Sequence, residues 1–219
     1  AGVDTAISNA VAAGQSSSAQ SFTLTTNADL FTGGTGNDIF TAVDTTLQVI
    51  DQIDGGAGTG DSLYFTDTSN AGGIAATAIS NIEHFYIRNV ETANGGETYD
   101  FGALSGETQV WHDRATDSST FTGLSAGATV GLKGDGSTVL GALTFQYATA
   151  SSAVAIAIDG GVGAVGTAPA ITESGTDGTA TAATISSTGA ANTVGTVDLA
   201  NATLTSVTIT ADTNLSGDF

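Results

Sequence analysis

The sequence predicts an all-β fold, a solenoid or a sandwich of short strands, with one short helix at the N-terminus. Segments rich in Thr, Val and Ala alternate with turns of Gly, Ser and Asn, as in TQVWHD, ALTFQYA and AVAIAIDGG. The 219 residues include 30 glycines and a single proline. Short strands cut by small-residue turns at regular intervals are typical of β-solenoids and β-sandwiches.

The single helix is expected in AGVDTAISNAVAAG, residues 1–14, where Gly14 is a suitable stop. Its apolar side chains recur at helical spacing: Val3, Ile7, Ala10 and Val11. The QSSSAQ segment that follows has the composition of a linker. We therefore divide the chain into a helix and linker over residues 1–20, a glycine-rich region over 21–70 and a longer β region over 71–219.

The charge balance excludes several classes of partner. Against 22 Asp and Glu the chain has 3 Lys and Arg, which gives a formal net charge of -19. Such a chain repels nucleic acid and anionic lipid and attracts cations. No apolar run approaches the roughly 20 residues that cross a bilayer. We expect no nucleic-acid binding and no membrane insertion.

Short carboxylates are concentrated at the start of the chain. Residues 1–70 contain eight Asp and no Glu, Lys or Arg, and the whole chain has no Cys. Without disulfides, an exported protein needs another fastener, and a hard divalent cation suits Asp in tight glycine loops. The alternative is that each Asp forms a turn through side-chain to backbone hydrogen bonds.

A nine-residue repeat favours the cation over the turn. When LTTNADLFT, residues 24–32, is written above GGTGNDIFT, residues 33–41, Asp29 stands over Asp38 at position six. Thr at positions three and nine and Phe at position eight also coincide. A period of this length indicates a repeat architecture in which one short unit stacks on the next.

Two further copies follow in the same frame. TLQVIDQID, residues 46–54, has Asp51 at position six, and an insertion of four residues, 42–45, separates it from the copy before. The segment GGAGTGDSLYF then brings Gly55, Gly56, Gly58 and Asp61, with one inserted residue. The repeat therefore extends from residue 24 to about residue 65.

The pattern G-G-x-G-x-D-x-U-x resembles the RTX nonapeptide repeat of proteins exported by Gram-negative bacteria. It is matched fully by Gly33, Gly34, Gly36, Asp38 and Phe40, and GGAGTGD matches it with a displacement of one residue. In that family each repeat pairs a turn with a short strand, and alternate turns stack around Ca²⁺. The resemblance implies an RTX-like parallel β-roll over residues 21–70, with Phe40 facing inward.

The resemblance also implies Ca²⁺ as the cofactor, held between carbonyl oxygens and Asp carboxylates. Glycine is needed because it allows backbone angles, and hence carbonyl directions, that other residues resist. On this interpretation Asp38, Asp51 and Asp61 project from successive turns into shared sites, whereas Asp67 and Asp177 lie outside the frame. The full expected metal site is Asp29, Gly33, Gly34, Gly36, Asp38, Asp51, Gly55, Gly56, Gly58 and Asp61.

The Thr-, Ala- and Gly-rich remainder, with the segment SNIEHFYIRN, resembles bacterial surface-layer proteins of the RTX class. It implies a secreted, extracellular structural protein of the bacterial cell surface that self-associates into a lattice or filament. Two alternatives remain open: a binding or stalk module of an RTX adhesin that contacts a cell-surface glycan, and a non-catalytic region of an exported RTX enzyme. Because neither end has a recognisable signal, we interpret the chain as part of a longer protein.

No enzyme activity is expected. The sequence contains no Cys nucleophile, G-x-S-x-G, H-E-x-x-H or P-loop lysine. The two histidines, His84 and His112, are interpreted as structural residues rather than catalytic or zinc-binding ones.

Two arginines and the single tryptophan have structural interpretations as well. Arg88 and Arg114 are expected to pair with nearby carboxylates such as Glu83 and Asp113. Trp111 is expected to be a core or interface aromatic, and an exposed position would instead suggest that it stacks on sugar.

Overall fold

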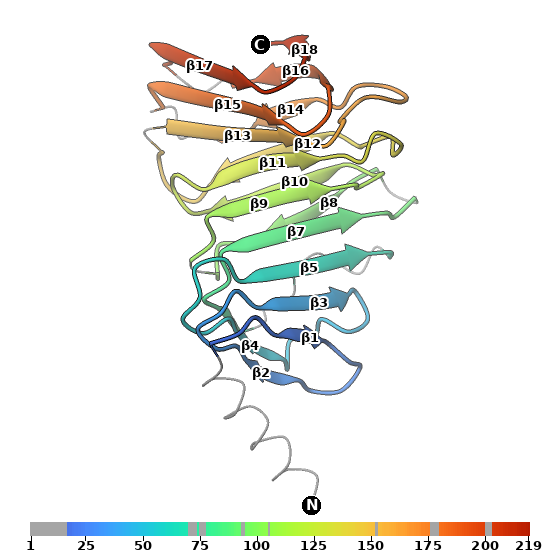
Figure 1. Cartoon of the computed structure of the whole chain (residues 1–219), viewed down its shortest axis with the longest axis vertical. Helices are drawn as coiled ribbons and strands as arrows, with labels where there is room; N and C mark the ends of the chain where they lie inside the picture. The colour runs from blue at the N-terminus through green and yellow to red at the C-terminus, as the bar shows by residue number, and fades with distance from the viewer. Residues whose placement is uncertain are drawn as a thin grey trace, which may run out of the picture.

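The computed structural model describes residues 17–69, 74, 78–92, 95–104, 106–151, 153–175, 180–199 and 203–219. These residues form a parallel β-solenoid, with odd-numbered strands on one face and even-numbered strands on the other (Figure 1). The all-β prediction is confirmed, and the solenoid, not the sandwich, is the arrangement. The helix expected over residues 1–14 falls outside the described residues, which include no helix.

One face is a nine-stranded sheet that runs without a break from the glycine-rich region into the rest of the chain. Its strands pair parallel, each with the odd-numbered strand before and after it. They are β1 (Ser21–Thr23), β3 (Ile39–Val43), β5 (Ser62–Asp67), β7 (His84–Asn89), β9 (Gln109–Asp113), β11 (Thr129–Lys133), β13 (Ala153–Asp159), β15 (Ala182–Thr188) and β17 (Ser206–Ala211).

The opposite face is divided into two parallel sheets. Three strands form the first: β2 (Leu30–Thr32), β4 (Gln52–Asp54) and β6 (Ala78–Ser80). Six strands form the second: β8 (Glu97–Asp100), β10 (Ser119–Leu124), β12 (Leu143–Tyr147), β14 (Ile171–Glu173), β16 (Asn192–Asp198) and β18 (Leu215–Asp218). One odd-numbered and one even-numbered strand, with their two turns, make one rung of the solenoid.

Strand register bears out the nine-residue frame. Ser21 pairs with Ile39, so the first rung takes 18 residues, the length of two nonapeptides. Ile39 pairs with Ser62, 23 residues later. The four-residue insertion and the single extra residue account for this longer rung, because both fall between these two strands.

The core follows from the alternation of side chains along each strand. In β7, Phe85 and Ile87 are buried between the two faces, whereas their neighbours point outward. Phe40 is fully buried, as predicted, and its ring stacks on that of Phe22 at 4.9 Å between centroids. Each fully buried side chain of this size contributes about 1.5–3 kcal/mol. One continuous apolar core therefore joins the rungs.

The side chain of Asn192 connects neighbouring rungs through hydrogen bonds. Its side chain is buried, and its Oδ1 accepts hydrogen bonds from the backbone N–H groups of Gly161 and Val162 at 2.9 and 2.8 Å. Its Nδ2 donates to Ser187 Oγ at 2.9 Å and to the Thr188 carbonyl at 3.0 Å. Because both ends of the amide are satisfied, its burial fixes the turn after β13 without an unpaired polar group.

His112 is a buried residue of β9. Burial lowers its pKa to about 4, although the backbone of Gly141 and the charge of Asp113 oppose the shift. The folded state therefore holds a neutral imidazole at pH 7, in agreement with a structural role. At acid pH a proton must be added to the His112 imidazole, and the apolar core disfavours the resulting charge.

We expect the free energy of unfolding to fall as the pH drops from 6.5 through 4, in part because His112 gains a proton more readily in the unfolded chain. Between a usual pKa of 6.5 and one of about 4, the loss attributable to His112 is about 3 kcal/mol. His112→Leu removes the titrating group. Denaturant unfolding at pH 7 and pH 4 should show a smaller acid loss for the variant; equal losses would contradict this account.

Candidate metal centre

The aspartates at position six lie on two opposite edges of the solenoid. Asp38 and Asp61 directly precede β3 and β5, where the chain passes from an even-numbered to an odd-numbered strand. Asp29 and Asp51 directly precede β2 and β4, where the chain passes in the other direction. The structure thus brings Asp38 together with Asp61 and places Asp51 with Asp29. We call the first edge the glycine edge, since the glycines of the repeat lie there.

Carboxylates form a ladder along the glycine edge. Asp38 Oδ1 accepts a hydrogen bond from the backbone N–H of Gln20 at 2.7 Å, and Asp61 Oδ1 accepts one from Asp38 N–H at 2.6 Å. Glu83 Oε2 continues the series, accepting from Asp61 N–H at 2.9 Å. Each carboxylate therefore fastens its own turn to the turn before it. Such charge-assisted bonds are among the stronger hydrogen bonds in proteins.

Glycines line this edge because oxygen atoms occupy the space that side chains would need. A Cβ on Gly33 would collide with the carbonyl oxygen of Gly55 and with the Asp38 carboxylate. Gly56, with φ at +94°, would place a Cβ against the carbonyl oxygens of Gly33 and Gly34. The turn at Gly33 and Gly34 therefore stacks closely on the turn at Gly55 and Gly56.

The same crowding recurs at Gly58. A Cβ there would lie 2.5 Å from the Gly36 carbonyl oxygen and 2.7 Å from each oxygen of the Asp61 carboxylate. Carbonyl and carboxylate oxygens from two stacked turns thus converge on the glycine backbone. This is the donor chemistry that Ca²⁺ takes in proteins, six to eight oxygens on a flexible frame.

Asp61 has an oxygen that the protein leaves unsatisfied. Its side chain is fully buried, and Oδ2 has no hydrogen-bond partner among the described residues. Burial raises the pKa of Asp61 to about 6, and the charges of Glu83, Asp38 and Asp54 add to the shift. A buried carboxylate oxygen without a partner costs free energy unless a proton or a cation binds it.

On the opposite edge both carboxylates are satisfied by the chain itself, as is that of Asp38 on the glycine edge, whose Oδ2 accepts a hydrogen bond from Gly34 N–H at 2.6 Å. Asp29 accepts hydrogen bonds from the backbone N–H and the hydroxyl of Thr25, at 2.6 and 3.1 Å. Asp51 accepts from Asp29 N–H at 2.9 Å and from Gln48 N–H at 2.8 Å. This edge has the geometry of the turn-forming alternative, in which Asp anchors the backbone.

The structure adds two residues that the nine-residue frame did not include. Asn81 has φ at +53°, and its carbonyl oxygen lies where a Cβ on Gly55 would be. Glu83 directly precedes β7, just as Asp61 precedes β5. The spacing of 23 residues from Asp38 to Asp61 and 22 from Asp61 to Glu83 was the available signal, and it follows the rung rather than the nonapeptide.

Asp67, outside the frame, is not a neutral surface residue. It is buried and accepts a hydrogen bond from the Tyr99 hydroxyl at 3.0 Å. Burial raises its pKa as well. Asp177, the other aspartate outside the frame, falls outside the described residues.

Side chains alone do not complete a metal site. Across the described ranges, no three side chains of His, Asp or Glu gather into a group that could hold a metal ion. A cation on the glycine edge would therefore depend on carbonyl oxygens as well as on Asp38 and Asp61. Within the same part of the chain, no helix has the length and apolarity to cross a membrane.

Comparison with family models, curated proteins and solved structures finds no match for this chain. The resemblance to the RTX repeat therefore rests on the glycines and aspartates of residues 24–65 alone.

Gly55→Ala should destabilise the protein, because the new methyl group collides with the backbone oxygen of Asn81 rather than with a movable side chain. We expect a loss of about 1–3 kcal/mol in the free energy of unfolding, the usual cost of overpacking. Gly60→Ala is the matched control, since its Cβ meets only the exposed side chain of Asn37. Chemical denaturation of both variants provides the comparison. Equal stability of the two variants would contradict the close stacking of the glycine turns.

Proposed function

We propose that this chain is a calcium-dependent structural module of a secreted, self-assembling bacterial surface layer. The observation that carries the calcium proposal is the buried, unpartnered Oδ2 of Asp61 beside the stacked glycine turns. Asp38, Asp61 and the carbonyl oxygens of Gly33, Gly34, Gly36 and Gly55 would hold the ion. Their oxygen chemistry suits a hard cation, and bound Ca²⁺ would neutralise the carboxylates that face one another there.

Calcium binding would be coupled to folding on this proposal. The donors come from two turns that meet only when the rungs stack, so the unfolded chain offers no comparable site. Binding free energy to such a site becomes folding free energy. A calcium concentration 100 times the dissociation constant would stabilise the fold by about 2.7 kcal/mol.

Asp61→Asn tests the site because the difference in unfolding temperature between variant and wild type should change sign when Ca²⁺ is added. Without metal the variant should unfold at the same or a higher temperature than the wild type, because it removes a buried charge of which one oxygen has no hydrogen-bond partner among the described residues. With Ca²⁺ the order should reverse, since the wild type gains a ligand and the variant does not. Thermal unfolding in EGTA and in millimolar Ca²⁺ measures both arms, and calorimetric titration measures the affinity.

The matched control is Asp198→Asn, which removes the same charge from an exposed position at the end of β16. It should keep the wild-type calcium response. Mg²⁺ should stabilise the wild type less than Ca²⁺, because it requires a tighter octahedron and loses water reluctantly. Equal responses to both ions, or from both variants, would indicate charge screening and would exclude the site.

Self-assembly is supported by the way the rungs present their edges. In β17 the side chains of Val207 and Ile209 are 51% and 47% exposed, although the matching positions in β15 are buried. Another rung, from a second copy or from further chain, would bury these side chains and pair with the backbone of β17. Ordered rungs are required for such packing, which links assembly to calcium.

Ca²⁺ should therefore convert the purified protein from small particles into sheets or filaments. Light scattering and negative-stain electron microscopy, in EGTA and after addition of millimolar Ca²⁺, would follow the change. Asp61→Asn should assemble only at higher Ca²⁺, whereas Asp198→Asn should behave as the wild type. A protein that stays dispersed at saturating Ca²⁺ would contradict the surface-layer proposal and leave the calcium site to be judged by its own titration.

A binding or stalk module of an adhesin is the second candidate. It is favoured by one specific observation, the half-buried Trp111 and tyrosines on the outer surface of the nine-stranded sheet. Such a module would present a stiff rod to a cell-surface glycan.

A further inference from the structure

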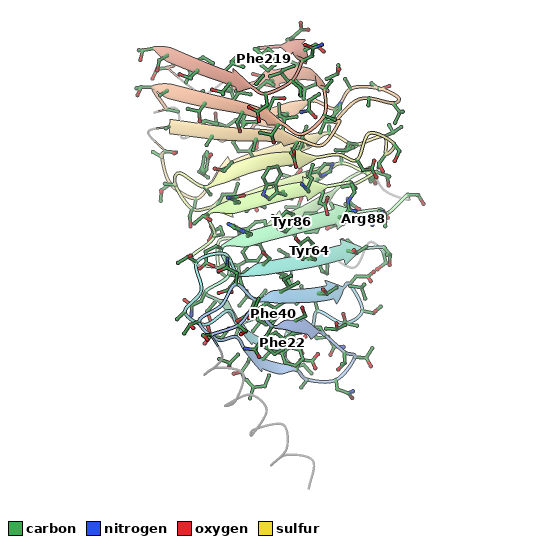
Figure 2. The ribbon with its side chains drawn as sticks, in the orientation of Figure 1. Phe22, Phe40, Tyr64, Tyr86, Arg88 and Phe219 are labelled. Atoms are coloured by element: carbon green, nitrogen blue, oxygen red, sulfur yellow. The ribbon has the colours of Figure 1, made fainter. Side chains whose placement is uncertain are left out.

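Three aromatic side chains form a row on the outer surface of the nine-stranded sheet. Tyr64 of β5 pairs in register with Tyr86 of β7, which pairs with Trp111 of β9. The two tyrosine rings stack at 4.5 Å and 5°, and the Tyr86 and Trp111 rings lie 6.3 Å apart at 7°. All three are half-buried, and Figure 2 shows Tyr64 and Tyr86 one above the other on this sheet. We call Tyr64, Tyr86 and Trp111 the outer aromatic row.

The row differs from the other tyrosines and from the rest of the sheet surface. Tyr99 and Tyr147 are buried in the core, where their hydroxyls donate to Asp67 and to the Ala128 carbonyl. Next to the row, Gly131 leaves room for the indole, because a Cβ there would collide with the Trp111 ring. Three of the four outward positions in β13 are alanines, and the fourth is Asp159.

All three basic residues of the chain lie around this row. Lys133 Nζ is 5.8 Å from the centroid of the Trp111 ring and 2.5 Å from Asp159 Oδ2. Arg114 follows β9 and donates two hydrogen bonds to the Asp113 carboxylate, of 2.9 and 2.7 Å. The pairing of Arg114 with a nearby carboxylate is as the sequence predicted. In a chain with a net charge of -19, no other part of the sequence has a Lys or an Arg.

Arg88 is the basic residue without an ion pair in the part of the chain that the structure describes. It points outward from β7 two residues after Tyr86, about 6.6 Å further along the strand, and Figure 2 shows it near the end of that strand. Among the described residues it makes no ion pair, and its buried Nε has no hydrogen-bond partner. The expected pairing with Glu83 is not formed, because Glu83 precedes the first residue of β7 and Arg88 lies five residues further along the extended strand, about 16 Å away.

Arg114 is also held in an uncommon conformation. Its φ is +47°, a left-handed value that costs a non-glycine residue free energy and that recurs at functional sites. The hydrogen bonds to Asp113 hold the guanidinium in place, and they raise its pKa further. A charged planar group is thus fixed beside the strand that carries Trp111.

We propose that the outer aromatic row is a binding site for an acidic glycan. A pyranose ring would lie across the outward-facing parts of Tyr64, Tyr86 and Trp111, because the two tyrosine rings already stack on each other and the apolar face of a sugar suits amphipathic aromatic side chains. A carboxylate on the sugar would pair with Arg88, whose guanidinium offers the planar fork that carboxylates prefer. This site is separate from the proposed calcium site, so either can fail without the other.

Charge and area favour a glycan over other partners. A specific protein interface buries about 800 Å² on each side, whereas this row is three half-buried rings amid alanines and polar side chains. Nucleic acid carries a charge on every nucleotide and requires a basic groove, which a net charge of -19 opposes. Sugar chains with spaced carboxylates need fewer cations than nucleic acid does.

Trp111 makes the test site-specific, because it is the only tryptophan in the chain. The probe is a hexasaccharide of alternating glucuronate and N-acetylglucosamine, and the neutral comparison is a hexamer of N-acetylglucosamine. Both are titrated into the folded wild type in millimolar Ca²⁺, with Trp fluorescence and calorimetry as readouts. The acidic hexasaccharide should shift the Trp emission and bind more tightly than the neutral one.

Variants separate stacking from charge. Trp111→Ala, followed by calorimetry, should weaken binding of the acidic hexasaccharide about tenfold or more. Arg88→Gln should remove the preference for the acidic over the neutral hexasaccharide while circular dichroism stays unchanged. Thr184→Ala, an exposed change on β15 of the same sheet, should bind as the wild type.

Several results would overturn the proposal. One is equal binding of the two hexasaccharides by the wild type, and another is unchanged binding in both Trp111→Ala and Arg88→Gln, which would indicate calcium bridging to surface carboxylates. Tighter binding of a thymidine oligonucleotide than of the acidic hexasaccharide, or no binding of either sugar, would do the same. If Trp111→Ala fails to fold, Arg88→Gln and the wild-type fluorescence decide the matter.

Discussion

In-register parallel stacking of the rungs is the constraint on which the rest of this structure depends. Every strand takes its backbone hydrogen bonds from the strands of the neighbouring rungs, so no rung can bury its core alone. Stacked strands lie about 4.8 Å apart, and a residue type repeated at one position meets its own kind at that distance. Stacking therefore favours Phe22 on Phe40 and Tyr64 on Tyr86. The same geometry opposes aspartate on aspartate.

The two edges of the solenoid differ in how the charges of stacked aspartates are compensated. Opposite the glycine edge, the carboxylates of Asp29 and Asp51 accept hydrogen bonds from backbone N–H groups and from the Thr25 hydroxyl. Each charge is therefore compensated locally. On the glycine edge, Asp61 uses one oxygen to fasten Asp38 and leaves the other buried without a partner. Small residues there admit backbone oxygens in place of side chains. A divalent cation would complete this edge, whereas it would add little to the other.

Charge is also distributed unevenly between the edges and the outer surface of the nine-stranded sheet. Acidic residues mark the turns, where they bond to backbone N–H groups, whereas the three basic residues surround the outer aromatic row. Two of these are held by Asp113 and Asp159, and Arg88 is left without an ion pair among the described residues. The protein as a whole repels anions, and the outer aromatic row is the place where an acidic ligand could approach.

The sequence by itself determined the all-β class, the nine-residue period, the inward position of Phe40 and the insertions that lengthen the second rung, because each is a property of local spacing. Only the tertiary structure decided which aspartates share an edge. A rung takes two nonapeptides, so successive copies face opposite edges, and Asp38 meets Asp61 rather than Asp51. Stacking of the rungs likewise brought Glu83 to the glycine edge, where it accepts a hydrogen bond from Asp61 N–H. Contacts between rungs join residues 18 or more positions apart, and local pattern does not specify them.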